Sequence, residues 1–241
     1  MIIITITITT GKAMAERASL DPAGLYRLMA WLSPSFPVGA FSHSHALEWV
    51  VETGEVRDVA ALTDWVAQIL RFGGGRQDAI LLAETWRAAT AGDAARLADV
   101  TELAAALSPS KERAVETLSQ GKAFALAAEA SWPAEGGASP SGDLAYPVAV
   151  GIAAARHRIP LGPTLAAYLH AFVANLISAG IRLVPLGQTD GQKAIAALEP
   201  VVAAVADEAI TAGLDDLGGC VLLADIASMR HETQYTRLFR T

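Results

Sequence analysis

The sequence predicts an all-α fold, a single-domain bundle of about nine or ten helices. Hydrophobic residues make up 52% of the 241 residues, but aromatic residues make up only 6%. The apolar residues are mainly alanine and leucine, the strongest apolar helix formers. Apolar side chains also recur at helical spacing in successive segments, and short breaks of glycine, proline, serine and aspartate separate these segments.

Boundary residues define the helices of the first half. The proline-rich residues 33–37 end a first helix over 25–32, and Asp58 is a candidate N-cap for the next, over 59–72. Three glycines, 73–75, are expected to end that helix. Further aspartates then predict two more helix starts. The expected starts are Asp78 or the position just before it for residues 79–90, and Asp93 for a helix that runs to 107.

The second half continues the same pattern. Ser110 is expected to cap a long helix through residue 132, after which turn-forming residues dominate 133–143. Four more helices are predicted over 146–157, 163–183, 190–212 and 217–228. The loop at 133–143 could divide the chain, but each half would be a poor globule. We therefore expect one helical domain over 21–228 and a tail over 229–241. Residues 1–20 are interpreted as an extension, either disordered or an expression-vector remnant.

Charge and composition exclude several functions. The net charge of −7, without a basic cluster before the tail, argues against nucleic-acid binding. Residues 159–181 carry no formal charge and are long enough to span a bilayer, but early prolines and scattered polar side chains favour a buried central helix, not a membrane span. Cys220 is the single cysteine and is expected to be buried, which fits a reducing cytoplasm.

Candidate catalytic and metal motifs are weak. Ser42 and His43 supply the residue types of a nucleophile pair, but sequence adjacency is not catalytic geometry. His43 and His45 could share a metal ion only in an extended turn; the alternative is a helix started by proline whose polar side chains cap backbone groups or line an interface. His170 lies in an apolar helical segment and is predicted to be a hydrogen-bonded core imidazole. The sequence therefore predicts no enzyme, resident metal or cofactor.

The last fourteen residues, 228–241, differ from the rest of the chain. They carry three arginines and one glutamate, which gives this end a charge of +2 and the preceding residues −9. Arginine and aromatic residues concentrate binding energy at protein interfaces. We therefore interpret this end as a binding segment that orders against a partner, which requires strong anchors because ordering costs conformational entropy.

Three separated segments resemble the UreF family of urease accessory proteins. They are SPSFPVGAFSHSHALEW at 33–49, LAAYLHAFVANLISAGIRLVPLGQTDGQ at 165–192 and SMRHETQYTRLFR at 228–240. The resemblance implies an all-α, homodimeric, chaperone-like cytoplasmic protein that bridges UreD (also called UreH) and the GTPase UreG and delivers them to apo-urease for nickel insertion. An alternative within the same complex is a regulator of GTP hydrolysis by UreG, as activator or as fidelity checkpoint.

The resemblance also implies two sets of site residues. The set expected to bind UreD/UreH is Arg230, His231, Glu232, Tyr235, Arg237, Leu238, Phe239 and Arg240. The set expected to form the UreG surface is Ser35, Pro37, Gly39, Ser42, Ser44, His45 and Glu48. The chain departs from the family pattern at Ala46, where glycine is common, and at His45, which is often aromatic or small. These departures leave the detail of the UreG contact open.

Overall fold

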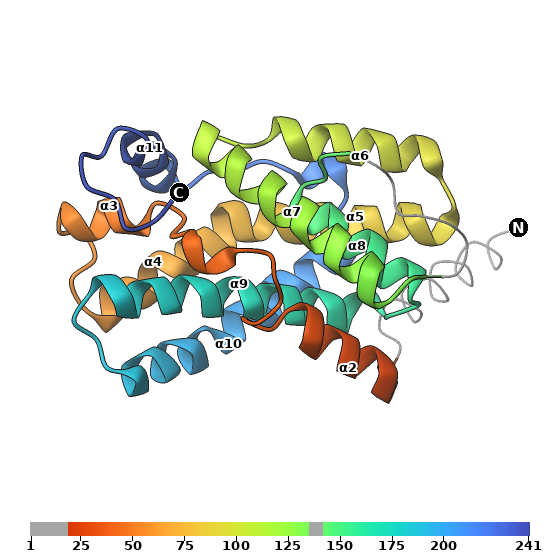
Figure 1. Ribbon diagram of the computed structural model, residues 1–241, viewed down its shortest axis with the longest axis horizontal. Coiled ribbons are helices and arrows are strands. Elements are labelled where there is room, and N and C mark those ends of the chain that lie inside the picture. Colours follow the sequence, from red (N-terminus) through yellow and green to blue (C-terminus); the bar gives the residue numbers. More distant parts are fainter. Residues whose placement is uncertain (1–18, 135–141) are drawn as a thin grey trace, which may run out of the picture.

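The described residues form a bundle of α-helices without a strand (Figure 1). The computed structural model describes residues 19–134 and 142–241. Within them, α2 to α11 make ten α-helices, and two short 3-10 helices, η1 and η2, complete the regular structure. The all-α prediction is confirmed. Most of the predicted N-terminal extension and residues 135–141 of the predicted loop lie outside the described residues.

The helices follow one another with short connections. In chain order they are α2 (Pro22–Trp31), η1 (Ala40–Ser42), α3 (Leu47–Glu52), α4 (Val59–Phe72), α5 (Gly74–Ala91), α6 (Ala94–Ala106), α7 (Lys111–Ser131), α8 (Tyr146–Arg156), α9 (Leu161–Leu183), α10 (Gln188–Thr211), η2 (Leu214–Asp216) and α11 (Leu222–His231). The predicted caps Asp58, Asp93 and Ser110 each accept a hydrogen bond from the backbone N–H three residues later. Local capping chemistry therefore determines these three starts.

Helix α9 passes through the middle of the bundle and packs against α10, α4, α5 and α3 (Figure 1). It is long and apolar enough to cross a membrane by length and composition, but half of its most apolar window is buried inside the protein. Leu165, Leu169 and Val173 lie on its buried side. His170, predicted to be a core imidazole, is instead exposed, because it lies on the opposite side of α9.

Helix α7 approaches the start of α8 through a glycine. A Cβ atom on Gly121 would lie 2.0 Å from the carbonyl oxygen of Leu144. Real atoms do not approach so closely, so any side chain at this position would push the two segments apart. Gly121 is therefore required for the close contact between the middle of α7 and the backbone that leads into α8.

The break between α4 and α5 differs from the prediction. Helix α5 begins at Gly74, whereas the sequence predicted a helix over 79–90, and the Gln77 N–H donates to the Gly73 carbonyl. Asp78 is therefore not a cap but a half-buried residue inside α5, where it accepts a hydrogen bond from the Tyr168 hydroxyl. The local preference of aspartate for helix starts is overridden by this tertiary contact.

The last helix is also displaced from its predicted range. Helix α11 runs from Leu222 to His231, whereas the sequence pattern predicted 217–228. Gly218 and Gly219 both have positive φ angles, 126° and 92°, which keeps this stretch out of the helix. Cys220 follows them and is exposed, so its predicted burial is wrong. The apolar residues that follow Cys220 lie at the start of α11 and not in a buried core segment.

Candidate functional site

The residues that follow α11 fold back onto the protein between α3, α7 and η1, and we call residues 232–241 the tail (Figure 1). The Arg240 N–H donates to the Ser42 carbonyl oxygen at 2.8 Å. The N–H and the hydroxyl of Ser44 donate to the Thr241 carbonyl oxygen at 2.6 and 3.0 Å. The tail therefore lies alongside the serine- and histidine-rich segment, although almost 200 residues separate them in sequence.

Glu48 holds the tail from the first turn of α3. Its carboxylate accepts the backbone N–H groups of Leu238 at 2.7 Å and Phe239 at 3.0 Å. Its Oε2 also lies 3.2 Å from His231 Nε2. The side chain is buried, and hydrogen bonds to an ionised acceptor are stronger than neutral ones, so Glu48 is a central anchor for the tail.

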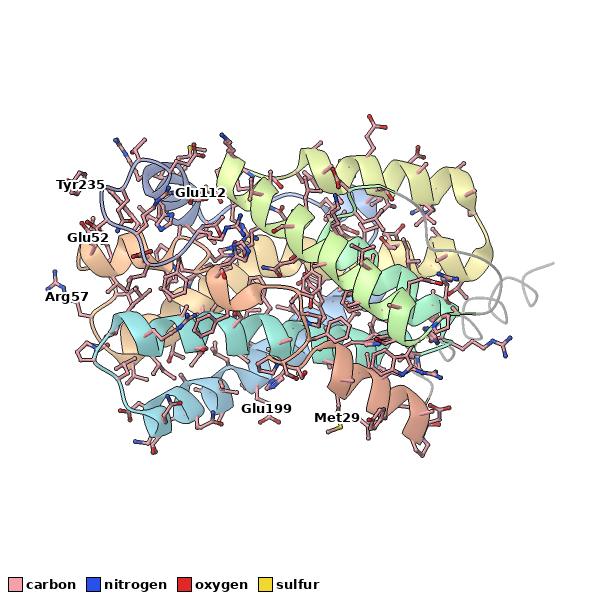
Figure 2. The ribbon with its side chains drawn as sticks, in the orientation of Figure 1. Met29, Glu52, Arg57, Glu112, Glu199 and Tyr235 are labelled. Atoms are coloured by element: carbon pink, nitrogen blue, oxygen red, sulfur yellow. The ribbon has the colours of Figure 1, made fainter. Side chains whose placement is uncertain are left out.

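Glu112 performs the same role from the first turn of α7. Its Oε2 lies 2.7 Å from His231 Nδ1, and its Oε1 accepts a hydrogen bond from Arg237 at 2.9 Å. The His231 side chain is fully buried between the two carboxylates. Glu112 lies close beneath α11 in Figure 2, so this contact joins the end of α11 to the start of α7.

An arginine from α9 stacks between two aromatic rings at the tail. The Arg182 guanidinium carbon lies 3.7 Å from the centre of the Phe41 ring and 4.4 Å from that of Phe239. It also donates a hydrogen bond to the Phe41 carbonyl oxygen at 3.0 Å, and burial lowers the pKa of Arg182. Phe239 is 5% exposed. Cation–π contacts of this kind stabilise the docked tail against α9.

The Thr241 hydroxyl connects the tail to a buried polar cluster. It donates to Glu116 Oε2 at 3.0 Å, so it must accept the proton of His43 Nδ1, which lies 2.8 Å away. Burial raises the pKa of Glu116, but the positive charge of Arg113 and the contacts with His45 and His43 outweigh it and hold that pKa well below its usual range. Burial lowers the pKa of both histidines. Glu116 is therefore a buried, ionised acceptor.

Two cavities lie beside this cluster. One, of about 200 Å³, is lined by His45, Asp78, Arg113 and Tyr168 among others. A second, of about 260 Å³, is lined by residues of α5 and of the 218–220 stretch before α11, and it shares His45, Asp78 and Arg113 with the first. Burial raises the pKa of Asp78 to about 6. Among the described residues, no group of histidine, cysteine and carboxylate side chains has the geometry of a metal site.

Helix α11 presents its large apolar side chains to solvent. The side facing the protein consists of small or polar residues, namely Ala224, Ala227, Ser228 and His231. The outward side consists of large apolar residues, which we call the α11 outer face: Leu222 and Leu223, each 65% exposed, Ile226 at 42% and Met229 at 51%. This arrangement reverses the usual amphipathic pattern of a surface helix. Contiguous exposed apolar residues of this kind mark interaction sites.

Comparison with known proteins decides the family. A sequence model described as UreF matches residues 56–199, more than half of the chain. The chain belongs to the UreF family. It is 57% identical to the urease accessory protein UreF of Rhodopseudomonas palustris strain HaA2, over 97% of this chain and 98% of that protein. The UreF of Bradyrhizobium diazoefficiens is 54% identical over 94% and 95%, and that of Xanthobacter autotrophicus 51% over 96% and 97%. The chain is therefore an accessory protein of the urease system.

Not all of the UreF residues at the C-terminal end that were expected to bind UreD/UreH are accessible. Six are exposed and two, His231 and Phe239, are buried in the protein itself. Tyr235 is fully exposed and points away from the protein in Figure 2, and Leu238 is 77% exposed. The other exposed members are Arg230, Glu232, Arg237 and Arg240. Leu238 and Phe239 cannot insert together into a partner in this conformation, because Phe239 already packs under Arg182.

Of the residues expected to form the UreG surface, some are exposed and others are buried. Ser35, Pro37 and Gly39 are exposed and Ser42 is half-buried. Ser44, His45 and Glu48 are buried, so in this conformation they cannot contact a partner directly. The segment over 33–46 is not the expected proline-started helix: it consists of turns and η1, and α3 begins only at Leu47 after His45 and Ala46 adopt left-handed φ angles.

The sequence predicted two separate binding segments in this UreF-family chain, but the structure joins them. Glu48 belongs to the first segment and holds Leu238 and Phe239 of the second. The sequence analysis did not identify Glu112 and Arg182 as part of this site. The charge contrast between the end and the body of the chain was interpreted as binding to a partner, and it did not indicate that acidic residues of the same chain hold the tail.

Proposed function

We propose that this protein is a non-catalytic, homodimeric adaptor of urease maturation in the cytoplasm. It bridges UreD/UreH and the GTPase UreG and presents them to apo-urease for nickel insertion. Membership of a family of urease accessory proteins supports the general role. The partners and the nickel step come from the resemblance described above, and the surfaces of the described residues suggest where each partner binds.

The α11 outer face is the observation that carries the proposal. Fully burying one side chain of this size contributes about 1.5–3 kcal/mol, so leaving four exposed is unfavourable for an isolated protein. Exposed Arg230, Arg237 and Arg240 belong to the same end of the chain. We therefore assign the α11 outer face and the exposed tail residues to UreD/UreH, whose complementary surface would be an apolar groove with an acidic rim.

The exposed part of the serine-rich segment is assigned to UreG. Ser35, Pro37 and Gly39 are accessible to a partner. Glu48 contributes indirectly, because it fixes the tail and the start of α3 beside this segment. On this proposal the docked tail supports both binding surfaces, so that loss of tail docking weakens both contacts.

Co-expression of the three accessory proteins followed by size-exclusion chromatography tests the assignment to UreD/UreH. We expect Leu223→Glu to reduce co-purification of UreD/UreH by roughly tenfold or more, because a charge at the centre of an apolar interface is unfavourable. The matched control is Leu126→Glu on α7, since Leu126 is 66% exposed and Leu223 is 65% exposed. The proposal fails if both variants retain UreD/UreH equally.

A second variant pair tests the UreG surface in the same assay. Ser35→Arg adds a large side chain at an exposed position of the serine-rich segment, and we expect it to release UreG while UreD/UreH stays bound. The control is Ser131→Arg at the exposed end of α7. Retention of UreG by Ser35→Arg would remove this segment from the assignment. The elution volume of the protein alone reports whether it is a dimer.

A further inference from the structure

The second cavity described above, of about 260 Å³, is lined by both hydrogen-bond donors and carboxylates. About 10–15 Å³ of such volume holds one water molecule, so this cavity has room for a small ligand. Gly73 and Gly74, at the start of α5, form one part of its wall. No side chain caps this helix start, and the first N–H groups of a helix have no acceptor within the helix. This part of the wall therefore offers hydrogen-bond donors.

Gly74 leaves space open beside His45 and Arg113. A Cβ atom at this position would lie 3.3 Å from His45 Cε1, 3.5 Å from His45 Nε2 and 3.6 Å from Arg113 Nη2. Because Cε1 lies between the two ring nitrogens, the edge of the ring that carries both of them faces this space. Arg113 pairs with Glu116 through Nη1, which leaves Nη2 on the side of Gly74. Two nitrogen-bearing side chains therefore meet the start of α5 at the cavity.

His45 has a ring nitrogen without a partner. The residue is 6% exposed and lines both cavities. Within residues 19–134 and 142–241, its Nδ1 has no hydrogen-bond partner, and Glu116 Oε1, at 3.9 Å, is too distant to be one. Burial lowers the pKa of His45, so the neutral ring offers one N–H and one lone pair. A buried polar atom without a partner is unfavourable, and a ligand in the cavity would supply the missing hydrogen bond.

The charges on the cavity wall disfavour an ion of either sign. Arg113 would repel a cation, and the carboxylates of Asp78 and Asp225 would repel an anion. Asp78 accepts the Tyr168 hydroxyl through Oδ2, so its Oδ1 can accept a hydrogen bond from a ligand. A neutral molecule that carries both a carbonyl oxygen and N–H groups can pair with the arginine and with a carboxylate at the same time. The wall therefore fits an amide better than a salt.

We propose that this cavity binds a small neutral amide, of the chemical class to which urea belongs. The carbonyl oxygen accepts hydrogen bonds from Arg113 Nη2 and the start of α5, and the N–H groups donate to Asp78 and to the lone pair of His45. Arg113 also pairs with Glu116, which accepts the hydroxyl proton of Thr241. The site therefore lies beside the contacts that hold the tail, and it is independent of the partner assignments above.

Three planar molecules of similar size and different charge test the ligand class: urea, guanidinium and nitrate. The backbone amide shifts of Gly74 and Gln77 are followed by NMR up to about 100 mM of each, far below the molar concentrations at which urea unfolds proteins. We expect saturable shifts with urea and half-saturation at roughly 1–50 mM, because so small a ligand binds weakly. Both ions should bind about tenfold more weakly or worse. Shifts that rise only linearly with urea, or comparable saturation by either ion, overturn the proposal.

Gly74→Ala tests the location of the site. The added methyl group occupies the space beside His45 with its nearest neighbour 3.3 Å away, so we expect the affinity for urea to fall by about tenfold or more. Gly187→Ala at the start of α10 is the matched control, because its nearest neighbour is 3.7 Å away and it lies outside the cavity. Equal affinities in the two variants overturn the proposal. If Gly74→Ala does not fold, Overhauser effects between urea and the His45 ring of the unchanged protein decide, and their absence contradicts the site.

Discussion

The hydroxyl of Tyr168 on α9 donates a 2.7 Å hydrogen bond to the carboxyl group of Asp78 on α5. Tyr168 is buried and Asp78 is half-buried, and both line a cavity. Burial raises the pKa of Asp78 to about 6, against 3.8 in an unfolded chain. Near neutral pH the protein therefore keeps a carboxylate in a place that favours its neutral form, which lowers stability.

Asp78→Asn is expected to stabilise the protein at neutral pH. The unfolded state ionises Asp78 above pH 3.8, whereas the folded state does so only near 6, so the cost grows as pH rises through this window and is complete above it. The amide oxygen of asparagine can still accept the Tyr168 proton. We expect a gain of up to about 3 kcal/mol at pH about 7.5 and almost none at pH about 4.

Thermal unfolding at both pH values checks this prediction. Asp143→Asn is the control, because its side chain is 69% exposed and it should change the melting temperature equally little at each pH. A melting temperature of Asp78→Asn that is unchanged or lowered at neutral pH would show that the carboxylate is stabilised in the folded protein.

Glu48→Gln is expected to loosen the tail. Glutamine has one acceptor oxygen where Glu48 uses two, so the amide of Leu238 or Phe239, or the ring of His231, loses its partner. Each buried group left unsatisfied costs about 1–3 kcal/mol. Hydrogen exchange of residues 238–241 should accelerate by roughly tenfold or more. Glu102→Gln on the exposed side of α6 should leave this exchange unchanged.

Substitution of the neighbouring tail residues Phe239 and Leu238 should affect two different properties, tail docking and partner binding. Phe239→Ala removes a buried ring and its contact with Arg182, so it should destabilise tail docking by about 3 kcal/mol. Leu238→Ala removes a side chain that is 77% exposed, so it should leave docking intact but weaken binding of UreD/UreH. Exchange rates and co-purification measured on both variants check this. Equal effects on docking would contradict the inward and outward placement.

Gly121→Ala is expected to destabilise the fold, because its Cβ would lie 2.0 Å from a backbone oxygen that cannot move independently. Overpacking of this kind costs about 1–3 kcal/mol or more. Gly213→Ala is the control, since nothing lies within 4 Å of the corresponding Cβ position. Chemical denaturation of both variants measures the difference, and a Gly121→Ala protein as stable as the control would contradict the close approach of α7 to α8.

The fold was predictable where local chemistry determines it. Asp58, Asp93 and Ser110 cap their helices as the sequence indicates, because a cap needs only a backbone N–H three residues away. The start of α5 and the burial of Asp78 were not predictable, because they depend on Tyr168, which lies 90 residues further along the chain.

The site was predictable in its location but not in its construction. Residues 33–49 and 228–240 were both identified as binding segments. Their mutual contact depends on Glu48 and Glu112, whose partners in the tail lie more than 120 residues away. No spacing rule connects such positions. The reversed polarity of α11 was equally hidden, because a periodic pattern does not indicate which side of a helix faces the protein.

The contact between Glu48 and the tail also has a consequence for biosynthesis. Glu48 lies 190 and 191 positions before the two amides that it binds, so these bonds cannot form until residues 238 and 239 have left the ribosome. A chain that stops earlier can still build the helices, but it leaves the Glu48 carboxylate without these two amide donors and Arg182 without its contact with Phe239. Docking of the tail, and the support that it gives to both proposed binding surfaces, can therefore develop only after residues 238 and 239 have been synthesised.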